Sequence, residues 1–218
     1  LTTAEKIEAA TRQQRHCSAW FLHRKGRITA SVFKDVCRSK RLNCTALLKR
    51  LLNANSITSP AMRYGINCEP VAKERALAGF KAKHTNGRLE DCGLMIHPDY
   101  PYLGCSPDGL LYCDCHPTAL LEVKCLYSLR NTHPSEIIKE GQSKTDFCLD
   151  AAGRLKTSHK YYYQVQAQLH LNLVGSTVCY LYLHVDQGGV LIPIQKDEGF
   201  METHVDTLES FFSEYNST

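Results

Sequence analysis

Two carboxylates and a lysine are the residues whose types and spacing best suit chemistry. Asp108 lies in the segment SPDGL at 106–110, and Glu122 and Lys124 lie in LEVKC at 121–125. Side chains alternate between the two faces of a strand, so Glu122 and Lys124 point one way while the valine between them enters the core. If the two segments pair as a hairpin, Asp108 arrives beside Glu122.

The pairing of Asp108 with Glu122 predicts a metal site. Two adjacent carboxylates repel each other unless a cation lies between them, and hard oxygen ligands suit Mg²⁺ or Mn²⁺. A lysine one residue beyond a ligand can orient or deprotonate an attacking water and offset developing charge. These groups could together hydrolyse a phosphodiester. The alternative is a surface strand whose Glu and Lys face water, because E-x-K occurs by chance in many strands.

The elements that would position these residues follow from hydrophobic periodicity and from turn residues. A capping box at Thr2 and Glu5 opens a helix toward His16, and Pro70 must kink or restart the helix over 61–80. Helices are also expected over 29–37, 45–52 and 159–173, an antiparallel meander over 94–97, 103–105, 110–112 and 119–125, and a hairpin over 177–185 and 190–194. The sum is one α/β or α+β domain over 1–218 with a central mixed sheet. Its parts are a mainly helical portion (1–85), a sheet core with a long helix (90–195) and a C-terminal helix (199–216).

Composition is that of an ordinary globular protein. The 218 residues are 43% hydrophobic and 22% charged, and no apolar run approaches the roughly 18–20 residues of a membrane span. A net charge of +4 permits nucleic-acid binding without requiring it. The start resembles no secretory signal and lacks an initiator methionine, so we expect an excised or processed chain. Eleven cysteines without any sign of export predict reduced thiols inside a cell, in the nucleus or the cytoplasm.

Five motifs occur along the chain in a set order. They are RKGRITAS at 24–31, GINCE at 65–69, SPDGL at 106–110, EVKC at 122–125 and YQVQ at 163–166. With these motifs the chain resembles, over nearly its full length, the lambda-exonuclease family of the PD-(D/E)xK nuclease superfamily. This family is also called the YqaJ-type viral recombinase or alkaline exonuclease group, and its members act in DNA recombination and repair. The resemblance implies a restriction-endonuclease-like core, with a central mixed sheet flanked by helices.

The resemblance also implies the parts played by individual residues. Asp108 and Glu122 would hold Mg²⁺ or Mn²⁺, as one or two ions, together with the backbone carbonyl of Val123. Lys124 would serve the nucleophilic water. Glu69 would extend the carboxylate cluster and contact a second metal or its waters.

A pocket for a terminal phosphate is implied as well, built from Arg24, Ser31, Ser106 and Gln164. An arginine fork and hydroxyl donors suit a phosphate, and a helix N-terminus near Ser31 would add backbone amides. Each residue has a plainer alternative. Ser31 could cap a helix, Arg24 could pair with a surface carboxylate, and Gln164 could close a buried hydrogen-bond network.

The function implied is a 5′-to-3′ exonuclease on linear duplex DNA with a 5′-phosphate. The alternatives are an endonuclease or flap-type nuclease, a nuclease that acts on RNA, or a catalytically silent DNA-binding module of a recombination or transposon-derived protein. The implied partners are duplex DNA ends and a single-strand annealing recombinase, with no membrane. Members of the family form toroidal trimers or act as monomers, and both states stay open here.

A second group of metal-binding residue types lies at the expected hairpin tip, in Cys113-Asp114-Cys115-His116. Thiols and imidazoles could bind zinc, with Cys92 or His97 completing the site. The spacing matches no standard zinc finger, so the sequence favours a tip loop with incidental cysteines.

Trp20 and Phe21 are expected in the core, although either could lie near the DNA entry.

Overall fold

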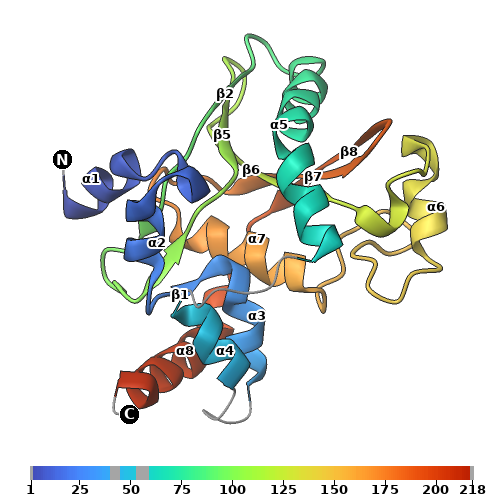
Figure 1. Ribbon diagram of the computed structural model, residues 1–218. Coiled ribbons are helices and arrows are strands. Elements are labelled where there is room, and N and C mark those ends of the chain that lie inside the picture. Colours follow the sequence, from blue (N-terminus) through green and yellow to red (C-terminus); the bar gives the residue numbers. More distant parts are fainter. Residues whose placement is uncertain (1, 40–44, 53–58, 217–218) are drawn as a thin grey trace.

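The computed structural model describes residues 2–39, 45–52 and 59–216 and has the mixed α/β architecture that the sequence predicts (Figure 1). The helices of this part of the chain are α1 (Thr3–Ala10), α2 (Ser18–Arg24), α3 (Phe33–Arg38), α4 (Thr45–Leu51), α5 (Pro60–Lys81), α6 (Ile137–Gly141), α7 (Lys160–Leu171) and α8 (Phe200–Asn216), with 3₁₀ turns η1 (Gln14–His16), η2 (Ala30–Val32), η3 (Tyr127–Leu129) and η4 (Pro134–Glu136). The strands are β1 (Ile28–Thr29), β2 (Arg88–Glu90), β3 (Met95–Ile96), β4 (Leu103–Cys105), β5 (Gly109–Tyr112), β6 (Ala119–Cys125), β7 (Val178–Val185) and β8 (Gly188–Gln195). Within these ranges no helix combines the length and apolar character needed to cross a membrane.

The strands form two mixed sheets, with the orders β1-β4-β3 and β2-β5-β6-β7-β8. In the larger sheet β6 and β7 run parallel and the other neighbours are antiparallel. The prediction of one antiparallel meander over 94–125 is therefore wrong. β3 and β4 pair with each other and with the unpredicted β1, whereas β5 and β6 join the unpredicted β2. Strands of two to four residues have too little pattern to show which sheet they join.

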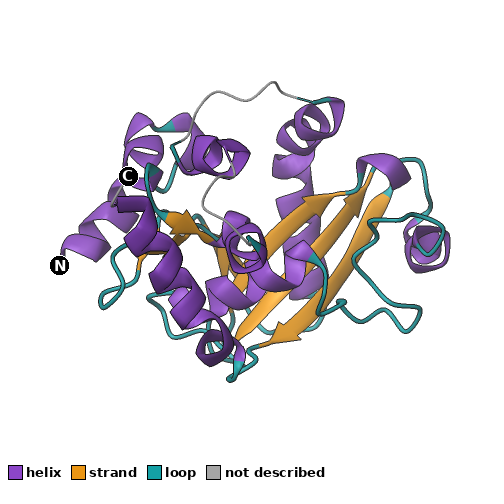
Figure 2. Cartoon of the chain, turned by 90° about the horizontal axis from the view of Figure 1, so that it is seen from below, coloured by secondary structure: helices purple, strands orange, loops and turns teal. Residues whose placement is uncertain are grey.

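Helices cover both faces of the larger sheet, whose strands lie side by side in Figure 2. On one face Ala72, Ala76 and Phe80 of α5 pack in a cluster that contains Leu121 and Val123 of β6. On the other face Val165, Ala167 and Leu169 of α7 pack in a cluster that contains Leu120 and Cys179. Because consecutive residues of β6 alternate between these clusters, the strand is buried on both sides.

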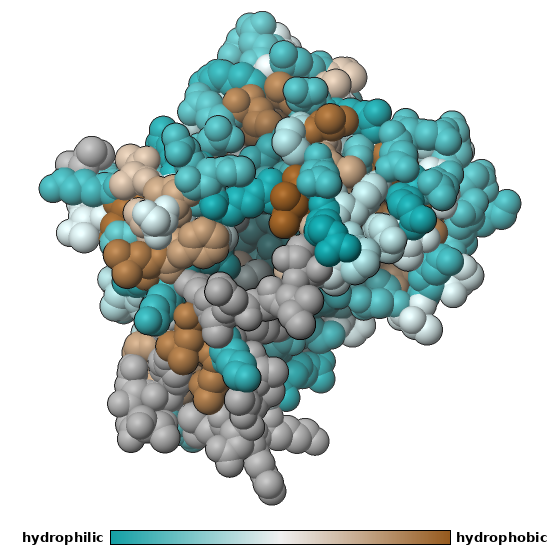
Figure 3. Space-filling view, in the orientation of Figure 1, coloured by the Kyte–Doolittle hydropathy of each residue, from teal (hydrophilic) through white to brown (hydrophobic). Residues whose placement is uncertain are grey.

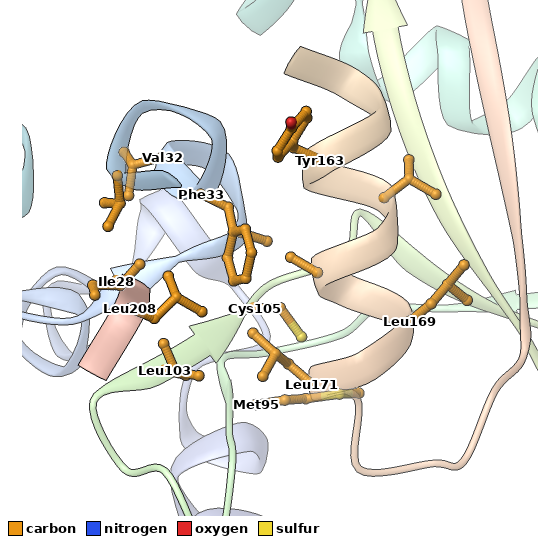
Figure 4. Packing of buried hydrophobic residues seen from close by; sticks show 14 of the residues in the cluster. Ile28, Val32, Phe33, Met95, Leu103, Cys105, Tyr163, Leu169, Leu171 and Leu208 are labelled. Atoms are coloured by element: carbon orange, nitrogen blue, oxygen red, sulfur yellow. The ribbon is translucent and has the colours of Figure 1, made fainter. Parts of the chain in front are cut away.

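The cluster on the α7 face continues between the N-terminal helices and the smaller sheet. Phe33 of α3 is fully buried, and its ring stacks on Phe200 of α8 at 5.6 Å between centroids. Figure 4 shows Phe33 pointing toward α7, with Cys105 and Leu171 in the same cluster. Cys105 is a free thiol that packs as a small apolar side chain.

Two expectations for the helices need correction. The capping box between Thr2 and Glu5 is present, but α1 ends at Ala10 instead of running to His16. Helix α5 continues through Pro70, so the predicted restart does not occur. Proline offers no N–H to the carbonyl four residues earlier, that of Ile66, and this oxygen accepts a hydrogen bond from Arg15 Nη2 at 3.2 Å. A tertiary contact thus satisfies a group that the helix leaves unpaired.

Candidate active site

Asp108 reaches β6 because β5 and β6 pair in the predicted register. Gly109 lies opposite Leu121, and the Asp108 N–H donates to the Leu121 carbonyl at 2.9 Å. Asp108 Oδ2 then accepts from the Val123 N–H at 2.6 Å. The N–H and C=O of one strand residue point to the same side. The Val123 carbonyl therefore also points toward Asp108. Val123 lies two residues beyond Leu121, where the pairing of β6 with β5 ends.

Glu122 faces α7 and is 2% exposed. Its Oε1 accepts from Lys124 Nζ at 2.6 Å and from Gln164 Nε2 at 2.5 Å, and its Oε2 accepts from Gln168 Nε2 at 2.7 Å. A buried carboxylate is tolerable only when it is paired and hydrogen-bonded, and these three donors meet that need.

Gln168 was not predicted from the sequence. It lies four residues after Gln164, and residues four apart share a helix face. That spacing is a signal that could have identified it.

The electrostatics of the cluster favour a bound cation. Burial, and then the charges of Glu122 and Glu69, raise the pKa of Asp108 to about 8. Burial alone would lower the pKa of Lys124, but Glu122 leads the contributions that raise it above its usual value, so Lys124 is protonated. Buried carboxylate oxygens with a backbone carbonyl beside them are the donor set that Mg²⁺ and Mn²⁺ fit.

Glu69 lies on α5, and its side chain forms no hydrogen bond with Asp108, Glu122 or Lys124, which are all within the described ranges. Its carboxylate forms ion pairs with Arg15 at 3.2 Å and Lys73 at 3.7 Å. Its charge nevertheless contributes to the raised pKa of Asp108, so it lies within electrostatic reach of that residue. Glu69 also lines a pocket of about 580 Å³ together with residues of η1 and α2. Figure 3 shows the molecule hollowed near its centre, with hydrophilic residues along the upper rim of the hollow.

Arg24 and Ser106 are connected through Trp20. The Arg24 guanidinium lies over the Trp20 ring, with Cζ 3.9 Å from the centroid, and Trp20 Nε1 donates to Ser106 Oγ at 3.0 Å. Burial lowers the pKa of Arg24 to about 10. Among the described residues no carboxylate lies within ion-pair distance of Arg24, so the surface ion pair considered from the sequence is not formed. Trp20, expected in the core, instead links two residues of the predicted phosphate pocket.

Ser31 lies within η2, which packs against α7, the helix that carries Gln164. The Ser31 hydroxyl is 3.2 Å from Thr29 Oγ1. The N-cap residues of η2 and of α3 are Thr29 and Val32, so the alternative that Ser31 caps a helix is wrong. The fold thus links Arg24 to Ser106 through Trp20, and Gln164 to Glu122 directly.

Gln14 is a further residue of the site that sequence reasoning missed. Its Nε2 donates to the carbonyls of Cys92 and Pro107, both at 2.8 Å. Its φ of 45° is in the left-handed region, which non-glycine residues rarely adopt. Gln14 therefore holds the backbone immediately before Asp108 in place. Its partners are 78 and 93 residues away in the sequence, so no local pattern indicates these contacts.

Comparison with known proteins gives one family and a set of solved structures. Residues 19–174 match the YqaJ-like viral recombinase domain. The chain is similar to LHK-Exo in complex with dAMP (26% identity, 91% of this chain and 92% of that chain, TM-score 0.66). It is also similar to the alkaline exonuclease LHK-Exo from Laribacter hongkongensis (25% identity, 91% and 92% covered, TM-score 0.63). KSHV SOX in a complex with RNA shares the fold (15% identity, 97% and 73% covered, TM-score 0.65). The search of curated proteins found no match.

Proposed function

Since this chain belongs to the YqaJ-like viral recombinase family, we propose that it is a Mg²⁺- or Mn²⁺-dependent exonuclease that degrades linear duplex DNA in the 5′-to-3′ direction from a 5′-phosphate. The family confirms the resemblance that the five motifs predict. Together with the likeness to LHK-Exo, it makes the chain a nuclease of the alkaline exonuclease type, a hydrolase of phosphodiester bonds. The metal ion, the 5′-to-3′ direction of degradation and the recognition of a 5′-phosphate are the parts that we propose.

The metal-binding groups in this proposal are Asp108, Glu122 and the carbonyl of Val123. The observation that carries it is the buried Glu122 carboxylate, which three side-chain donors orient beside a second buried carboxyl group. A divalent cation bound to these oxygens would polarise the scissile phosphate and offset the charge of the transition state. Glu69 would hold waters around this centre or a second ion.

Lys124 would act on the water that attacks the phosphorus. It is protonated next to Glu122, so its Nζ can donate to that water and to a phosphate oxygen. Its position over the Tyr161 ring, 5.0 Å from the centroid, limits how far the ammonium group can move.

The preference for a phosphorylated end rests on Arg24. This half-buried cation has no carboxylate partner among the described residues, and a terminal phosphate supplies the missing negative charge. Trp20 connects Arg24 to Ser106, two residues before Asp108. A phosphate held there would fix the distance between the DNA end and the bond that is cleaved. We place Ser31 and the second amide N–H of Gln164 in the same pocket.

The test compares four substrates in Mg²⁺: linear duplexes with a 5′-phosphate or a 5′-hydroxyl, a closed circle, and RNA. We expect rapid loss of the 5′-phosphorylated duplex only, and no activity in Glu122→Gln. Cutting of the circle would favour an endonuclease, and faster cutting of RNA would favour the RNA-acting alternative.

Arg24 has a matched control in its exposed neighbour Lys25. Charge-assisted hydrogen bonds contribute about 1.5–3 kcal/mol, so Arg24→Ala should lower the preference for a 5′-phosphate by about 10- to 150-fold. Lys25→Ala should leave the preference within about twofold. An equal preference in both variants would remove Arg24 from the pocket.

A further inference from the structure

Four side chains with nitrogen and sulfur donors converge at the end of β5 opposite to Asp108. Cys113, Cys115 and His116 come from the turn between β5 and β6, and His84 comes from the loop after α5. One donor atom of each residue lies within 4.8 Å of the other three. Five residues of extended chain, about 16 Å, separate Cys113 from Asp108, so this cluster is distinct from the catalytic carboxylates.

Four of the six distances between the donor atoms are slightly shorter than the edges of a tetrahedron around zinc. The Sγ atoms of Cys113 and Cys115 are 3.5 Å apart, each is 3.5 Å from His84 Nδ1, and His116 Nδ1 is 3.2 Å from Cys115 Sγ. Zinc bonds of about 2.3 Å to sulfur and about 2.05 Å to nitrogen give tetrahedral edges of about 3.8 Å between sulfurs and about 3.6 Å between sulfur and nitrogen. We propose that His84, Cys113, Cys115 and His116 hold a structural zinc ion.

The surroundings of His84 support this assignment. Its Nδ1 faces the two thiols, and a hydrogen bond of 3.0 Å joins its Nε2 to the hydroxyl of Tyr180. Histidines that bind a metal through one ring nitrogen commonly donate from the other to an oxygen, which fixes the tautomer and the ring orientation. Phe80 stacks on the same ring at 4.0 Å between centroids and 13° between planes. The ring is thus held in a liganding orientation by residues that are not ligands themselves.

The two loops that supply the ligands are also joined by hydrogen bonds. The Asp114 N–H donates to the Thr85 carbonyl at 3.0 Å, and Asn86 Nδ2 donates to Asp114 Oδ2 at 2.6 Å. The ligands are therefore brought together by the fold, as a binding site requires.

The zinc ion would stabilise the arrangement of the catalytic elements. It would attach the C-terminal end of α5 to the hairpin that carries Asp108 and Glu122. Glu69 lies on the same helix. Four protein ligands close the coordination sphere and leave no position for substrate, so the ion is structural.

The structure corrects the ligand set considered from the sequence. His84 completes the cluster, and neither Cys92 nor His97 belongs to it. Cys92 is fully buried in the main hydrophobic cluster, and the His97 ring lies beside Tyr100. His84 is 29 residues from Cys113, a spacing that matches no standard zinc finger.

The test measures zinc per chain by mass spectrometry of the full-length protein purified under reducing conditions without chelator. We expect about one zinc per chain, because the four ligands form a single closed site. Zinc should fall at least tenfold in Cys115→Ser and in His84→Asn. It should stay in the matched controls Cys17→Ser and His133→Asn, and in Asp108→Asn, which removes the catalytic carboxylate instead. Co²⁺ loading provides a second readout, with the thiolate charge-transfer and tetrahedral d–d bands present in the wild type and lost in Cys115→Ser.

Several outcomes would overturn the proposal. They are wild-type protein that binds neither zinc nor cobalt, zinc retained in Cys115→Ser, and zinc lost in Asp108→Asn. A disulfide between Cys113 and Cys115 in the reduced preparation, seen as a loss of two hydrogens in the intact mass, would also overturn it. Cys115 is exposed, so its substitution should not prevent folding; if His84→Asn does not fold, His116→Asn at another exposed position replaces it.

Discussion

Gln168 provides the sharpest test of how the active site is held together. Its Nε2 donates to Glu122 Oε2 at 2.7 Å, and the side chain is 1% exposed. Gln168→Leu keeps the approximate size of the side chain and removes this donor. A hydrogen bond to a charged group contributes about 1.5–3 kcal/mol, which corresponds to about 10- to 150-fold in metal affinity or rate. Substitution of a residue that orients a metal ligand commonly lowers metal affinity or activity by about 10- to 100-fold.

The helix offers a matched control two residues earlier. Gln166 is equally buried, but its amide bonds to the Gln195 carbonyl and the Asp197 N–H, away from Glu122. Both Gln→Leu variants should lower the free energy of unfolding, since each leaves backbone or carboxylate groups without a donor or acceptor. Only Gln168→Leu should raise the Mg²⁺ concentration needed for half-maximal nuclease activity.

The assay is a Mg²⁺ titration of the single-turnover rate on 5′-phosphorylated duplex, with folding checked by circular dichroism. We expect the midpoint for Gln168→Leu to rise by about 10-fold or more while the Gln166→Leu midpoint stays within about twofold of the wild type. The reasoning is refuted if folded Gln168→Leu keeps both midpoint and rate within twofold, or if Gln166→Leu is impaired to the same degree.

Three further predictions concern residues around the carboxylates. Lys124→Ala should lower the single-turnover rate by about 10²- to 10⁴-fold, and a smaller loss would exclude Lys124 from the chemical step. The pKa of Asp108 is raised to about 8 in the fold, so between about pH 4 and 8 the metal-free folded protein keeps a proton that the unfolded chain releases. Thermal stability in EDTA should therefore fall as the pH rises from about 4 toward 8. This slope should be smaller in Asp108→Asn, and an unchanged slope would contradict the assignment. Gln14→Ala should lower the free energy of unfolding, measured in urea, by about 1–3 kcal/mol, because two backbone carbonyls lose their donor. Gln14→Gly should be about 1 kcal/mol more stable than Gln14→Ala, because glycine adopts the left-handed backbone without strain. Equal stabilities of the two variants would refute backbone strain at this position.

The sequence determined the features that depend on neighbouring residues. Alternation along 119–125 placed Glu122 and Lys124 on one face and Val123 on the other, and the structure has Val123 packed in the cluster under α5. The register of the hairpin and the long helix that carries Gln164 also agree with the structure. These features follow from periods of two and of 3.6 residues, which a short window of sequence contains.

The tertiary structure decided which distant groups meet. Gln14 reaches Pro107 across 93 residues, Trp20 reaches Ser106 across 86, and Gln168 reaches Glu122 across 46. The division of the strands into two sheets also depends on contacts between distant residues. Which strands pair depends on how α5 and α7 pack against them, and not on the sequence of each strand alone. A local pattern specifies which face of an element a side chain occupies, whereas the partner on that face depends on how the whole chain packs. For this reason the sequence is enough to predict the catalytic carboxylates, while the residues that contact them become visible only in the fold.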